Sequence, residues 1–95
     1  MNEKLLDFFA SHFHQDWADD AADTDAVVDD VIGHTNGEDL AVIANLIDAM
    51  VRDIADDRLL NDTLQKLGSY YVPVDGAETR AWLTHVATRL RAASD

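Results

Sequence analysis

The residue types that can do chemistry gather in one short segment, Phe13-His14-Gln15-Asp16-Trp17. A His two residues before an Asp suggests a general base or a pair of metal ligands. On a helix, residues i and i+2 point about 200° apart, so His14 and Asp16 would not converge on one ion. A catalytic pair would also need a nucleophile and a third orienting group at hydrogen-bonding distance, which the sequence does not identify. We therefore expect a structural segment, with its two aromatic residues in the core and its three polar residues bonded to the backbone at the end of the first helix.

No other pattern indicates a catalytic, metal or cofactor site. His12, His34 and His85 are scattered singly, and without cysteine there is no thiolate zinc site. No register of the aspartates matches a calcium-binding EF-hand loop, although weak divalent binding stays open. Glycine-rich phosphate loops and the nucleophile elbow of hydrolases are absent from the sequence. We expect a protein without catalytic activity, metal or cofactor.

The charge balance points instead to a binding function. Nineteen acidic residues, sixteen of them Asp, face seven basic ones, which gives a net charge of −12. Such a surface repels nucleic acids and anionic membranes, and it steers association with a basic protein. A simpler interpretation is solubility or adaptation to high salt. The absence of cysteine, of a secretory signal and of any apolar run near the roughly 20 residues of a membrane span favours the cytoplasm.

The acids crowd between Asp16 and Asp30, where seven carboxylates fall within fifteen residues. We expect an acidic patch that contacts a basic partner, the alternative being a solvated face with no role. Asp56 and Asp57 would extend the patch if their helix begins near the one that starts at about residue 24. The predicted contact residues are Asp19, Asp20, Asp23, Asp25, Asp29, Asp30, Asp56, Asp57 and Tyr71.

Periodicity predicts an all-α domain over residues 1–95, a single compact bundle of about five short helices. Apolar stripes indicate the first four helices at Leu5, Leu6, Phe9 and Phe13, with Phe8 one turn after Leu5; at Val27, Val28, Val31 and Ile32; from Leu40 to Ile54; and from Leu59 to Leu67. The last helix carries Trp82, Leu83, Val86 and Leu90. Residues 70–74 should form an extended connector, because Pro73 disfavours helix in the residue before it. One of the adjacent Tyr70 and Tyr71 can then point inward and the other anchor an interface, unless both lie at the rim of the core.

Capping residues set the expected helix ends. Thr24 or Asp25 should begin the second helix, and Gly33 or Gly37 should end it. Asn36 with Asp39 resembles a capping box, and Asp56 should cap the next helix. Gly68 suits a left-handed position after that helix. The last helix should begin at Asp75, which has capping-box spacing to Glu78, or at Thr79.

Three motifs, in their order along the chain, resemble those of the immunity proteins of bacterial contact-dependent growth inhibition. The resemblance rests on Phe13-His14-Gln15-Asp16-Trp17, on Leu67-Gly68-Ser69-Tyr70-Tyr71, and on Trp82-Leu83 with Val86 and Leu90 behind it. It implies a small helical domain in the cytoplasm that binds and neutralises the C-terminal domain of a toxin, often a nuclease. The motif residues, including Gly68, Tyr70, Trp82 and Leu83, would then determine the fold. The main alternative is an acidic adaptor, or nucleic-acid mimic, that regulates another basic protein; a small hydrolase using His14 and Asp16 is a further one.

Overall fold

The computed structural model describes residues 3–73 and 76–94 of the chain, and the all-α prediction is confirmed for them. Their helices are α1 (Glu3–His12), α2 (Trp17–Asp20), α3 (Thr24–His34), α4 (Gly37–Asp53), α5 (Asp57–Lys66) and α6 (Gly76–Ser94). Five of these are the expected helices. The short α2 was not predicted, because four residues carry no periodicity.

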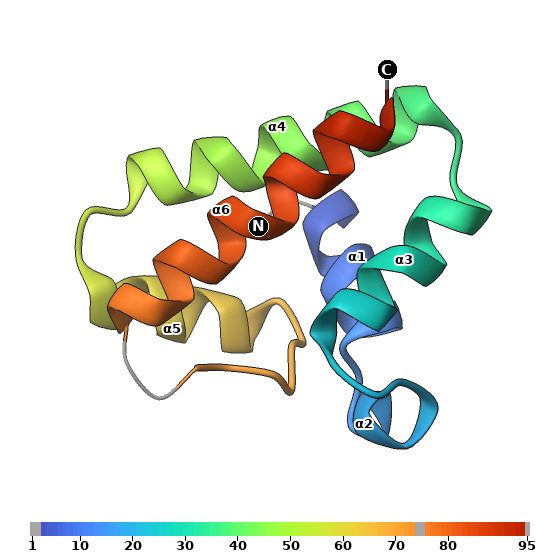
Figure 1. The fold of residues 1–95 in the computed structure, drawn as a ribbon. Coiled ribbons are helices and arrows are strands. Elements are labelled where there is room, and N and C mark those ends of the chain that lie inside the picture. The colour runs from blue at the N-terminus through green and yellow to red at the C-terminus, as the bar shows by residue number, and fades with distance from the viewer. Residues whose placement is uncertain (1–2, 74–75, 95) are drawn as a thin grey trace.

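α6 is the helix against which most of the molecule packs. It lies along α4 and also contacts α5 and α3, while α1 packs on α4 (Figure 1). The buried apolar residues of α6 are Leu83, Val86, Ala87 and Leu90, which fall on one helical face. In α1 the buried residues are Leu5, Phe8 and Phe9, whereas Leu6 is 38% exposed. The expected place of Leu6 in the core stripe is therefore wrong.

The caps predicted at Asn36 and Asp56 are confirmed. Asn36 Oδ1 accepts the backbone N–H of Asp39 at 2.8 Å, and Asp56 Oδ1 accepts those of Arg58 and Leu59 at 2.9 and 3.1 Å. These bonds satisfy N–H groups that have no partner inside the helix. Both helices therefore begin where the local sequence places them.

Two predicted helix ends, and one of the two alternatives for a third, are wrong. The cap of α3 is Asp23 rather than Thr24 or Asp25, since Asp23 Oδ1 accepts the N–H of Ala26 at 2.8 Å. The same helix continues through Gly33 to His34, and Gly37 begins α4. Thr79 lies inside α6, where its buried hydroxyl donates to Asn61. The alternative cap at Asp75 lies outside the described residues.

Gly68 adopts the left-handed conformation that the sequence predicts, with φ of 90°. Its N–H donates to Gln65 O at 3.0 Å and the N–H of Ser69 donates to Leu64 O at 3.4 Å. This pair of bonds is the Schellman motif that ends a helix. A Cβ at position 68 would lie 2.9 Å from the Cβ of Ala10, so the position also needs glycine for its close approach to α1.

Arg80 of α6 joins the end of α4 to the start of α5. Its guanidinium donates to the carbonyl oxygens of Val51 and Ile54, each at 2.7 Å, and it pairs with Asp57 at 3.0 Å. The carbonyls at the end of α4 have no partners within the helix, so a cation is favourable there. Arg80 therefore secures the sharp reversal between α4 and α5.

Candidate functional site: the α2–α3 face

Aromatic side chains from the three predicted motifs meet in one cluster, which includes Trp17 at the start of α2. The ring of Trp82 lies 5.1 Å from that of Phe13 and 4.8 Å from that of Tyr71, and Tyr71 lies 5.6 Å from Trp17. The N–H of Tyr70 also donates to Phe13 O at 2.8 Å, which ties the connector to the segment after α1. The motif residues thus form one cluster that holds α2 in place.

The polar residues of the first motif lie in the turn between α1 and α2. His14 Nδ1 accepts the backbone N–H of Asp16 at 3.0 Å, so the predicted side-chain bond to the backbone is confirmed for His14. Asp16 precedes α2 and makes no side-chain cap, and Gln15 is exposed. The ring of His14 therefore contacts the backbone of Asp16 rather than its carboxylate, and the two do not form a catalytic pair.

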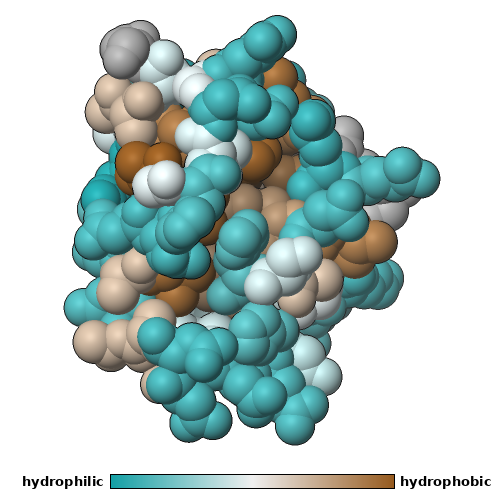
Figure 2. All heavy atoms as spheres, turned by 90° about the vertical axis from the view of Figure 1, so that its right-hand side faces the viewer, coloured by the Kyte–Doolittle hydropathy of each residue, from teal (hydrophilic) through white to brown (hydrophobic). Residues whose placement is uncertain are grey.

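Nearly all of the net charge belongs to the first half of the chain. Residues 1–51 hold twelve acidic residues and one lysine, a net charge of −11, whereas residues 52–95 hold seven acidic residues and six basic ones. Between residues 5 and 51 there is no Lys or Arg. We call the surface of the predicted patch the α2–α3 face, formed by Asp16, Asp19, Asp20, Asp23, Asp25, Asp29 and Asp30. Figure 2 shows this side of the molecule as mostly hydrophilic, with hydrophobic atoms visible between the polar side chains.

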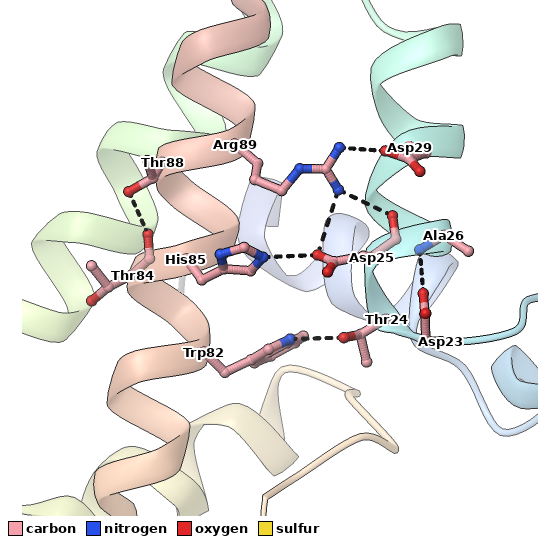
Figure 3. Close-up of polar contacts among 10 residues, drawn as sticks. All are labelled: Asp23, Thr24, Asp25, Ala26, Asp29, Trp82, Thr84, His85, Thr88 and Arg89. Carbon is pink, nitrogen blue, oxygen red and sulfur yellow. Dashed lines mark hydrogen bonds and ion pairs between the residues drawn. The ribbon is translucent and has the colours of Figure 1, made fainter.

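Two of these carboxylates are already paired within the molecule (Figure 3). Arg89 of α6 pairs with Asp29 and lies 3.5 Å from Asp25, and His85 bonds Asp25 at 2.8 Å. The hydrogen bond from His85 lowers the pKa of Asp25, and the charge of Arg89 adds to this effect. Asp25 and Asp29 therefore attach α3 to α6, and much of their charge is compensated locally.

The remaining acids of the face are more available to a partner. Asp19 is exposed with no side-chain partner among the described residues, as is Asp16. Asp20 lies 3.5 Å from His14, and Asp30 lies 3.4 Å from His34. Asp23 is exposed but caps α3. The carboxylates of the face with the fewest internal contacts therefore lie in α2 and directly before it.

Asp56 and Asp57 do not join this face. They begin α5, which starts on the side of the molecule opposite α3 (Figure 1). Asp56 caps α5 and Asp57 pairs with Arg80. The condition for extending the acidic patch to them, that the two helices begin near each other, is not met.

The two tyrosines differ sharply in exposure. Tyr70 is 66% exposed, whereas Tyr71 is partly buried against Trp17 and Trp82. One tyrosine therefore points inward, and the exposed one is Tyr70. A contact between Tyr71 and a partner stays a prediction, and the geometry adds Tyr70 as a more accessible aromatic residue.

A pocket of about 580 Å³ opens between α1, α2 and α3. Its lining includes His12, His14, Asp20 and Asp30 together with Trp17. Burial lowers the pKa of His12, against the opposing effect of the Asp30 carboxylate. Sequence reasoning treated His12 as an isolated histidine, because only the packing of three helices brings it beside residues 20 and 30.

The geometry offers no metal centre or membrane span within the described ranges. Over residues 3–73 and 76–94, no three His, Cys, Asp or Glu side chains are placed to hold a metal ion. None of the helices there has the length and hydrophobicity needed to cross a bilayer. What the described chain offers is a polar face and a pocket, which is an arrangement for binding.

Comparison with known proteins adds one match, which covers nearly the whole chain. The family model described as "CdiI immunity protein" matches residues 2–90. No curated protein and no solved structure matches the chain. The matched region includes the aromatic motifs, the Schellman glycine and the α2–α3 face. The chain therefore belongs to the CdiI immunity protein family, whose members protect against the toxins of contact-dependent growth inhibition.

Proposed function

We propose that this protein neutralises its cognate toxin by binding the toxin domain directly, in the cytoplasm, through the α2–α3 face. The observation that carries the proposal is the charge distribution, with −11 of the net −12 in residues 1–51. Opposite potentials on two proteins accelerate their encounter and orient it. The negative potential of this surface is complementary to the positive potential of a basic toxin domain.

Within the face, the exposed acids in α2 and directly before it are the leading contact candidates. Asp16 and Asp19 have no side-chain partners among the described residues, so binding a basic group there breaks no internal ion pair. Asp25 and Asp29 already pair with Arg89. To bind a basic group of the toxin, their carboxylates would have to bond both that group and Arg89, or release Arg89. We therefore rank the carboxylates of α2 above those facing α6.

A nuclease is the class of toxin that fits this surface best. Nucleases bind polyphosphate, so their active clefts are basic. Carboxylates spread over a helical face can occupy such a cleft in place of phosphates without being cleaved. The protein would then inhibit by excluding substrate and would need no catalytic chemistry of its own.

Binding to the C-terminal domain of the toxin encoded directly upstream tests the proposal. We expect the two chains to co-purify at low salt and the toxin's nuclease activity to fall as the complex forms. Asp16→Lys with Asp19→Lys should weaken the complex at least about tenfold. The matched control, Asp53→Lys with Asp62→Lys, makes the same charge change on α4 and α5 and should leave affinity nearly unchanged. No complex at low salt would overturn the proposal, and capture of a different basic cellular protein would favour the adaptor alternative.

A further inference from the structure

The pocket between α1, α2 and α3 has a lining that suits an organic cation. Asp20 and Asp30 contribute carboxylates, both more than two-thirds exposed, and Trp17 and Val27 contribute apolar surface. Its volume of about 580 Å³ lies within the range of sites that enclose a ligand, roughly 300–1,000 Å³. It can therefore hold a long side chain together with part of its backbone.

The partly buried His12 adds little positive charge to the pocket at neutral pH. Burial lowers the pKa of His12, so its ring is mostly neutral there. His14 Nδ1 accepts the N–H of Asp16, which places the proton of the neutral ring on Nε2, 3.5 Å from Asp20. The lining contains no Lys or Arg, and the other histidine near these carboxylates is His34, which is exposed beside Asp30.

We propose that this pocket receives a basic side chain of the toxin, arginine in preference to lysine. A guanidinium is planar and carries five N–H donors, so it can bond two carboxylates and also pack against an indole. Lysine offers a compact charge that is more strongly hydrated and stacks less well. The inference rests on the proposed function and assigns it a specific anchoring site.

The same geometry predicts a pH dependence. His12 faces two titratable groups, Asp30 of α3 and His14 in the turn after α1. His14 in turn faces Asp20 of α2. Protonation of His12 adds positive charge beside the bound cation. Arginine binding should therefore weaken as the pH falls through the lowered pKa of His12.

A titration of the full chain with N-acetyl-arginine methylamide, followed by NMR, tests the pocket without the toxin. We expect saturable shifts at the Trp17 indole and at His12 and His14. Asp20→Asn with Asp30→Asn should weaken binding at least about fivefold. The matched control is Asp16→Asn with Asp19→Asn, which removes the same charge from the same face outside the pocket and should change affinity by less than about twofold.

The outcomes separate this inference from the proposed function. Three results would overturn the assignment of the pocket to arginine. They are NMR shifts scattered over the surface, equal loss of affinity in both variants, and binding of N-acetyl-lysine methylamide that is as tight as that of the arginine compound. The toxin complex is measured with the same two variants. If the toxin binds the wild-type chain and Asp20→Asn with Asp30→Asn equally, while Asp16→Asn with Asp19→Asn weakens the complex, the pocket is not its anchor although the proposed function stands. If the toxin binds none of them, the proposed function itself fails, whatever the titration shows.

Discussion

Asp23 serves the fold and the acidic surface at the same time. Its carboxylate accepts the N–H of Ala26 at the start of α3, so replacing it affects stability before it affects binding. Asp23→Ala should lower the free energy of unfolding by about 1 kcal/mol, the usual cost of losing an N-cap. Urea unfolding followed by circular dichroism measures this. Asp19→Ala, which removes a carboxylate that caps nothing, should change stability by less than about 0.5 kcal/mol. Equal losses in the two variants would show that Asp23 does not act as a cap.

Asp25 links stability to pH through its contacts with α6. Its pKa is lowered chiefly by the hydrogen bond from His85 and further by Arg89, so folding favours its charged form. This contribution is complete above the ordinary pKa of an aspartate, near 3.8, and is lost as the pH falls through the lowered value. His85→Gln should raise the pKa of Asp25 toward its ordinary value, as NMR of the carboxyl carbon can record. An unchanged titration midpoint would contradict the role given to His85.

At the residue scale, the sequence identified residues but not their pairings. The string from Phe13 to Trp17 was expected to be structural, and Phe13 and Trp17 do lie in the aromatic cluster. The attachment of Asp25 and Asp29 to Arg89 joins positions about sixty residues apart, which no local pattern indicates. The acids that form one patch in the sequence therefore divide into those that pair with α6 and those that do not.

Among the elements, the turn after α5 depends on glycine for two independent reasons. Gly68 has a positive φ, and a Cβ there would meet Ala10 of α1 at 2.9 Å. Gly68→Ala should therefore destabilise the protein by about 1–3 kcal/mol. Gly33→Ala is the matched control, because it lies inside α3 with nothing within 4 Å of an added Cβ. It should stabilise the protein by about 0.5 kcal/mol. Thermal unfolding should show a lower melting temperature for Gly68→Ala and a higher one for Gly33→Ala. Melting temperatures that shift in the same direction would contradict the explanation.

The helices that could be predicted from the sequence are those with local signals. The caps at Asn36 and Asp56 and the left-handed Gly68 depend on residues within five positions of one another. α2 was missed because it is one turn long. The start of α3 was misplaced by one or two residues because three neighbouring residues, Asp23, Thr24 and Asp25, can each act as a cap. The pocket was missed because it exists only where three helices meet.

For the whole molecule, the dominant feature is the division of charge between the two halves of the chain. The second half carries six of the seven basic residues, and three of these, Arg80, Arg89 and Arg91, are committed to contacts between helices. The first half is left with a net charge of −11, part of it exposed on α2 and α3. Association with a basic toxin should therefore depend on where the charge lies, and not only on its total.

The most direct test is the association rate of the chain with the toxin domain, measured by stopped flow across a range of ionic strength. Asp16→Lys with Asp19→Lys, and Asp53→Lys with Asp62→Lys, each change the net charge from −12 to −8. We predict that the α2 variant associates about tenfold more slowly at low salt and shows a weaker salt dependence, while the control stays within about twofold of the wild type. Equal slowing of both variants, or no slowing of either, would contradict toxin binding through the α2–α3 face.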